Sequence, residues 1–168
     1  MANEERGVGW VGKERLNDVS PVQIGMAIRY TQDMTTTVKT HRGSCGCGAI
    51  KFSFTGSLDD VWFCHCSQCR KNYGMYGAFV GALRDSFKIN RTKKLLSYKS
   101  SSNTTRTFCG NCGASITWDR KGYARVYVLL GLLDEKARIK SAQHIFTKDK
   151  GAYYDICDHW PQFKTAPK

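Results

Sequence analysis

The sequence lacks any run of about 18 consecutive apolar residues, the length that a membrane-spanning helix needs. Its first residues also lack the apolar core and the cleavage pattern of a secretory signal. No repeat or low-complexity segment divides the 168 residues, a usual length for one domain. We therefore expect a soluble protein without a membrane partner, located in the cytoplasm, with the nucleus as the alternative.

Acidic residues are scarce in this chain. Asp and Glu number 14 against 26 Lys and Arg, which gives a formal net charge of +12. Such an excess is typical of proteins that meet nucleic acid or a small anion. Here the basic residues are dispersed in short doublets rather than gathered in a tract with interleaved aromatic residues. A solvated basic surface is the favoured interpretation, and a nucleic-acid partner is not favoured.

Long amphipathic helices are also missing, because the apolar residues alternate with a period of two. The alternation is clear at 22–30 and at 50–54, and further short apolar runs lie at 61–63, 79–83, 87–89, 116–118 and 126–133. Glycines separate these runs as turns, and only 134–142 has the pattern of a short helix. The sequence therefore predicts a mainly β fold in which turns carry the chemistry.

The chain has eight cysteines, and seven of them fall into three groups with short spacings. The groups are Cys45-x-Cys47, Cys64-x-Cys66-x-x-Cys69 and Cys109-x-x-Cys112. A reducing compartment keeps disulfides open, so these spacings indicate metal ligands rather than disulfide bonds. Residues two apart in an extended segment present their sulfurs to one side, and a C-x2-C spacing does the same through a tight turn. The groups therefore predict bound zinc.

Spacing favours one division of these cysteines. The two pairs, Cys45 with Cys47 and Cys109 with Cys112, would surround one tetrahedral zinc in a closed, structural site. The triple would then hold a second zinc with three protein ligands and an open fourth position, the geometry associated with catalysis. On spacing alone, other divisions of the three groups stay open.

Three stretches in this order resemble the glutathione-dependent formaldehyde-activating enzyme family, which includes centromere protein V. They are GSCGCGAI at 43–50, CHCSQCRK at 64–71 and RTFCGNCG at 106–113, and an ending with Trp160, Pro161 and Phe163 is also similar to the family's. The resemblance implies an Mss4-like zinc-binding β fold with short helical segments over 40–165. Residues 1–39 would then form an N-terminal extension, partly mobile, with a strand at 22–30.

The same resemblance implies two zinc ions. One is a structural zinc at Cys45, Cys47, Cys109 and Cys112, and the other is a labile catalytic zinc at Cys64, Cys66 and Cys69. The family's named reaction adds glutathione to formaldehyde and gives S-hydroxymethylglutathione. We therefore expect a zinc-dependent carbon-sulfur lyase-type enzyme whose partners are a small thiol such as glutathione and a small aldehyde. The sequence predicts no particular oligomeric state.

Several residues near the cysteines are weaker candidates. Arg70 and Lys71 directly follow the triple and could steer an anionic substrate, although such doublets are often only solvated. Arg106 could hold a substrate carboxylate, or else form a salt bridge at a strand end. His65 stands between two ligands, but alternation directs its side chain away from their metal. Cys157 stands alone in the sequence, and we expect it to be a small buried apolar residue.

Two other interpretations compete with the enzyme. A non-catalytic zinc module, binding chromatin, nucleic acid or protein as centromere protein V suggests, would use the basic surface and the N-terminal extension. A protein resembling methionine sulfoxide reductase would need a free nucleophilic cysteine, and only Cys157 is left over for that role.

Overall fold

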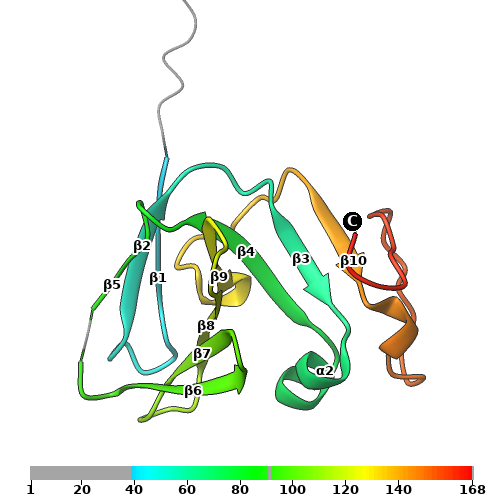
Figure 1. Ribbon diagram of the computed structural model, residues 1–168. Coiled ribbons are helices and arrows are strands. Elements are labelled where there is room, and N and C mark those ends of the chain that lie inside the picture. The colour runs from blue at the N-terminus through cyan, green and yellow to red at the C-terminus, as the bar shows by residue number, and fades with distance from the viewer. Residues whose placement is uncertain (1–38, 91, 168) are drawn as a thin grey trace, which may run out of the picture. The chain divides into compact units, whose positions relative to one another are not determined.

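The computed structural model describes residues 39–90 and 92–167. The predicted extension at 1–39, except for Lys39, lies outside these described residues, and so does the strand expected at 22–30. Strands dominate the described part of the chain, in a three-stranded and a seven-stranded sheet beside one α-helix, α2 (Ser67–Tyr73) (Figure 1). The prediction of a mainly β fold with short helical segments is confirmed. No described helix is long and apolar enough to cross a membrane.

The smaller sheet contains β1 (Thr40–Ser44), β2 (Lys51–Thr55) and β5 (Lys88–Ile89), in the order β1-β2-β5. The larger sheet has the order β10-β3-β4-β9-β8-β7-β6. Its strands are β3 (Val61–Cys64), β4 (Gly77–Leu83), β6 (Leu95–Ser101), β7 (Thr104–Cys109), β8 (Ser115–Arg120), β9 (Arg125–Leu129) and β10 (Ala142–Ile145). The described strand pairs are antiparallel, except that β10 is parallel to β3.

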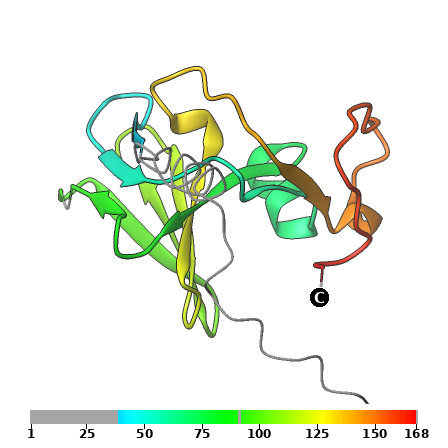
Figure 2. The same cartoon turned by 90° about the horizontal axis from the view of Figure 1, so that it is seen from above.

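Two short 3-10 helices complete the described elements, at Leu130–Leu132 and Thr147–Asp149. After β10 the chain forms a C-terminal segment, residues 146–167. This segment, coloured orange to red, lies on the β10 side of the larger sheet, away from β1 and β2 (Figure 2). It is held there by backbone hydrogen bonds to His144, whose N–H donates to Pro161 and whose carbonyl accepts from Phe163, both at 2.8 Å.

The central strands of the larger sheet have two covered faces, since successive residues of a strand point to opposite sides. In β4, Phe79 belongs to one buried cluster and Val80 to the other, and in β9 Tyr127 and Val128 divide in the same way. The cluster with Val80 and Val128 is the main core, and it includes Phe54 from the smaller sheet. Full burial of one such side chain stabilises the fold by about 1.5–3 kcal/mol. The cluster on the opposite face contains Phe79 and Tyr127 together with Cys64 and Cys69.

Gly43 in β1 leaves no room for a side chain. A Cβ atom there would lie 2.3 Å from the ring of Phe52 and 2.5 Å from the carbonyl oxygen of Leu132. We expect Gly43→Ala to lower the free energy of unfolding by about 1–3 kcal/mol, the usual cost of overpacking a core. Chemical denaturation measures this difference. Gly131→Ala is the control, because no described atom lies within 4 Å of its Cβ position. Equal midpoints for the two variants would contradict the prediction.

The prediction of a short helix at 134–142 is wrong, because these residues form no helix and are irregular until β10 begins. The backbone donors at both ends of the segment bond to other parts of the chain. The N–H of Asp134 donates to the carbonyl of Arg42 at 3.0 Å, and that of Lys140 donates to the carbonyl of Leu58 at 3.1 Å. These backbone groups therefore bond to other segments of the fold instead of forming the hydrogen bonds of a helix.

Candidate metal centres

Four cysteines from two hairpin turns converge on one point. Cys45 and Cys47 follow β1, while Cys109 ends β7 and Cys112 follows it. All four sulfur atoms lie within 4.8 Å of one another, with 3.5 Å from Cys45 to Cys47 and 3.7 Å from Cys47 to Cys109. Sulfurs in a tetrahedron around zinc, with bonds of about 2.3 Å, lie about 3.8 Å apart. This four-cysteine cluster could therefore hold a metal ion in a closed site.

Each of the two turns uses a glycine to bring its cysteines together. Gly48 and Gly113 have φ angles of 71° and 75°, a left-handed conformation that favours glycine. The N–H of Gly48 donates to the carbonyl of Cys45 at 2.9 Å, and that of Gly113 donates to the carbonyl of Cys109 at 2.8 Å. The N–H of Ile50 also donates to the sulfur of Cys45 at 3.3 Å. Cys45 and Cys47 therefore lie in a turn, and the prediction that a C-x-C pair lies in an extended segment is wrong for them.

The four-cysteine cluster is anchored in the main core. Cys45 and Cys109 are 3% and 0% exposed, whereas Cys47 lies at the surface. Hydrogen bonds from the side chain of Asn111 and the backbone N–H of Ala49 lower the pKa of Cys47 to about 6. The turns thus stabilise the thiolate, which is the form that binds metal.

The other three clustered cysteines surround the start of helix α2. Cys64 ends β3, Cys66 is the N-cap of the helix, and Cys69 lies in its first turn. The sulfur of Cys66 accepts a hydrogen bond from the N–H of Cys69 at 3.5 Å, so a ligand side chain also caps the helix. The three sulfurs lie within 4.8 Å of one another, and no fourth His, Cys, Asp or Glu of the described residues joins them. This three-cysteine cluster could hold a metal ion with one position open.

Arg106 of β7 places a buried positive charge beside the three-cysteine cluster. The residue is 4% exposed, and its guanidinium donates to the hydroxyl of Tyr73 at 3.0 Å and to the sulfur of Cys69 at 3.9 Å. Hydrogen bonds from Cys64 and then from Cys69 lower the pKa of Cys66 to about 2. The expected alternative, a strand-end salt bridge, is not formed, since no ion pair of the described residues includes Arg106.

A cavity of about 290 Å³ lies beside the three-cysteine cluster, and its three cysteines and Arg106 line it. Most of the remaining wall is aromatic, made by Trp62, Phe79, Trp118, Tyr123, Tyr127 and Phe146. We call it the aromatic cavity. A larger cavity of about 560 Å³, around Arg84 and Asp119, touches neither cluster, so the aromatic cavity is the better candidate for chemistry.

Arg70 and Lys71 lie in the last turn of α2 and are not among the residues that line the aromatic cavity. Their expected role in steering a substrate stays a prediction.

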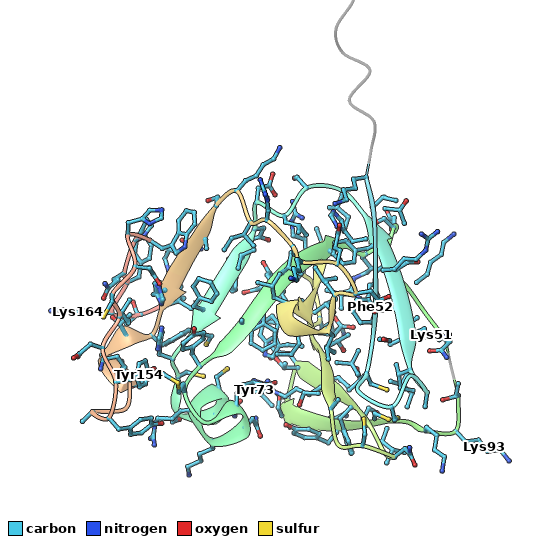
Figure 3. The ribbon with its side chains drawn as sticks, turned by 180° about the vertical axis from the view of Figure 1, so that it is seen from behind. Lys51, Phe52, Tyr73, Lys93, Tyr154 and Lys164 are labelled. Atoms are coloured by element: carbon cyan, nitrogen blue, oxygen red, sulfur yellow. The ribbon has the colours of Figure 1, made fainter. Side chains whose placement is uncertain are left out.

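Figure 3 shows Tyr73 and Tyr154 near α2, from the helix itself and from the C-terminal segment, whereas Phe52 lies at the other end, on β2. The end of the domain that carries the three-cysteine cluster is thus built from segments distant in sequence.

His65 faces away from the three-cysteine cluster, as alternation predicted, and it is fully buried. One ring nitrogen is hydrogen bonded to the hydroxyl of Tyr154, and the other lies 2.8 Å from a ring nitrogen of His144. The second nitrogen of His144 lies 3.0 Å from the carboxylate of Asp158. Burial, and then the nearby His144, lower the pKa of His65 to about 4. This chain of contacts ties the C-terminal segment to the ligand-bearing loop, and sequence reasoning missed it.

Cys157 is exposed, so the prediction of a small buried apolar residue is wrong. It lies in the C-terminal segment between Ile156 and Asp158, where the described chain has no regular structure. Cys157 belongs to neither cysteine cluster.

The described domain is therefore a mainly β protein with two separate cysteine clusters, each of which could bind a metal ion, and its donor sets are consistent with zinc. The model of the glutathione-dependent formaldehyde-activating enzyme family matches residues 40–149, and the chain belongs to this family. A crystal structure of a Rhodobacter sphaeroides protein, from a structural genomics programme, is similar at 24% identity with a TM-score of 0.49, over 57% of this chain and 90% of that one. A search of curated proteins finds no significant match.

Proposed function

We propose that the protein is a zinc-dependent carbon-sulfur lyase-type enzyme that forms or cleaves an adduct between a small thiol and a small aldehyde. Glutathione and formaldehyde are the reference pair, as the family's description indicates. One observation carries the proposal: three cysteine sulfurs meet beside a cavity, without a fourth ligand from the described residues. A closed cluster has no such access, so the two clusters have different roles.

The donor sets of both clusters fit zinc. Four cysteine sulfurs form a common structural zinc site, and three protein ligands with one open position are typical of a catalytic one. Zinc in the open site would lower the pKa of a bound thiol, or polarise a carbonyl oxygen as a Lewis acid. We assign the structural role to Cys45, Cys47, Cys109 and Cys112, and the catalytic role to Cys64, Cys66 and Cys69.

The reaction joins the thiol sulfur to the carbonyl carbon, while the carbon-oxygen double bond becomes single and the thiol proton passes to the oxygen. The buried guanidinium of Arg106 supports this step, because a positive charge beside Cys69 favours negative charge on a nearby sulfur or oxygen. Arg70 and Lys71 would act earlier, by attracting the carboxylates of a thiol such as glutathione.

Zinc removal is the first test of this function. We expect native mass spectrometry to find two zinc ions per chain, and mild chelation to remove one of them, because the three-cysteine cluster has one protein ligand fewer. NMR exchange spectroscopy then measures how fast glutathione and its formaldehyde adduct interconvert. The acceleration should vanish with the first zinc and return when zinc is added. An equal rate with and without that zinc would contradict the proposal.

A non-catalytic module that binds nucleic acid is less favoured. Lys51 and Lys93 project at one end of the domain and Lys164 at the other, so the basic side chains labelled in Figure 3 do not form one stripe. Nucleic-acid surfaces gather such charges along a groove or face.

A further inference from the structure

Strands of the larger sheet supply most of the aromatic wall of the cavity. Trp62 on β3 pairs with Phe79 on β4, and Tyr127 on β9 pairs with Trp118 on β8, which in turn pairs with Arg106 on β7. Residues directly opposite on neighbouring strands point to the same face, so the register places the members of each group together. This part of the wall is therefore fixed by the pairing of the strands.

The aromatic rings of the cavity wall pack against one another. The centres of Trp62 and Tyr127 lie 4.4 Å apart, and Trp118 packs edge-on against Tyr127 at 5.7 Å and against Tyr123 at 5.8 Å. The hydroxyl of Tyr127 donates to Asp60 at 3.1 Å, so this tyrosine offers its ring rather than its oxygen to the cavity. A preformed apolar wall of this kind binds a flat apolar group at little cost in conformational entropy.

The aromatic walls of the cavity do not match the surface of the reference substrates. Formaldehyde has only two non-hydrogen atoms, and glutathione is polar along its length, so this pair would leave much of the ring surface without apolar contacts. Such gaps lose dispersion energy. The cavity therefore suits an aldehyde with a further apolar group.

The charges around the aromatic cavity decide which substrate it suits. Its lining includes Arg106 and Arg120 but no Asp or Glu, and the guanidinium of Arg120 lies 5.2 Å from the centre of the Tyr123 ring. A cationic ligand would be repelled. The carboxylates of a thiol such as glutathione suit the arginines, and the apolar walls suit the substituent of the aldehyde.

We propose that the aromatic cavity binds an aryl or similarly sized apolar substituent of the aldehyde, so that the enzyme handles thiol adducts of aldehydes larger than formaldehyde. This inference rests on the proposed function. The reaction is balanced in the same way as before: the sulfur-carbon bond forms, the carbonyl double bond becomes single, and the thiol proton moves to the oxygen. The carbon then carries four different groups, so glutathione gives two diastereomeric adducts.

The test compares formaldehyde, acetaldehyde and phenylacetaldehyde, each with glutathione and the zinc-loaded protein, by NMR exchange spectroscopy. We expect the acceleration over the uncatalysed rate to be at least about tenfold greater for phenylacetaldehyde, because hydrophobic pockets discriminate by such factors. We also expect one diastereomer of its adduct to exchange faster than the other, since a bound substituent exposes one face of the carbonyl. Without enzyme, such a strong difference between diastereomers is not expected.

Two tyrosines form a matched pair of variants. Tyr123 lines the aromatic cavity and is 38% exposed, whereas Tyr153 is 63% exposed and does not line it. Tyr123→Ala should reduce the ratio of the phenylacetaldehyde rate to the acetaldehyde rate about fivefold, the size of one aromatic contact. Tyr153→Ala should leave this ratio unchanged.

The outcomes separate the two proposals. Acceleration of formaldehyde addition without a preference for phenylacetaldehyde would overturn the inference and leave the proposed function standing. A preference that survives Tyr123→Ala, and exchange that does not distinguish the diastereomers, would also overturn it. Acceleration with none of the three aldehydes would remove the proposed function and the inference together.

Discussion

Replacing Cys66 with serine is expected to lower the enzymatic acceleration at least about 100-fold while the protein stays folded. Thiolate sulfur is the ligand that zinc prefers here, and a serine hydroxyl is a poor substitute for it. The helix, by contrast, should survive. Cys66 is the N-cap of α2 through its sulfur, and serine is among the best N-cap residues, so the capping hydrogen bond to Cys69 can be kept.

The Cys66→Ser variant is measured by the formaldehyde exchange assay together with native mass spectrometry and thermal unfolding. We expect one zinc ion instead of two and a midpoint close to that of the parent protein. Ser67→Ala is the matched control, because Ser67 is the exposed neighbour on the same helix and belongs to neither cluster. Full turnover by Cys66→Ser would remove the three-cysteine cluster from the mechanism.

The strands and the cysteine clusters could be predicted because each has a local signal. Phe52 and Phe54 alternate with polar residues, and they form the buried side of β2 as expected. The C-x-C and C-x2-C spacings indicate which neighbouring sulfurs can approach one ion, and the structure shows the four-plus-three grouping that the spacing favoured. Such short-range patterns need no knowledge of the fold.

Helix α2 could not be predicted in the same way. Its seven residues complete only two turns, too few for a helical period to stand out. The N-cap signal was also hidden, because Cys66 caps the helix with a residue type that usually has another role. The opposite error, at 134–142, came from a helical pattern whose backbone groups bond to other segments of the fold.

The contacts of His65, which lies between two cysteines of the three-cysteine cluster, join residues far apart in the sequence. His65 meets His144 and Tyr154, which lie 79 and 89 residues further along the chain. The parallel pairing of β10 with β3 brings His144 to His65, and parallel strands leave no turn signal between them. Tyr154 comes from the C-terminal segment that follows β10. The aromatic cavity is similar, because Trp62 and Trp118 come from strands that the sequence cannot place in one sheet order.

Replacing Cys109 with serine should unfold the protein, whereas Cys66→Ser should lower turnover and leave the protein folded. Cys109 is fully buried, and its sulfur lies 3.7 Å from that of Cys47 in the other hairpin turn. Structural zinc sites in small peptides supply about 10–16 kcal/mol, while a whole domain is stable by only about 5–15 kcal/mol. The substitution would also place a serine hydroxyl in the buried core. We therefore expect no cooperative thermal transition for this variant.

Circular dichroism on heating and native mass spectrometry measure this outcome, and Cys157→Ser is the control. Cys157 is an exposed cysteine outside both clusters, so its replacement should leave two zinc ions and an unchanged midpoint. The comparison separates a structural metal from the general effect of removing a thiol. If Cys109→Ser unfolded within a few degrees of the parent protein, the four-cysteine cluster would not join the two hairpins through a metal. The main core would then have to hold β1 and β7 together without it.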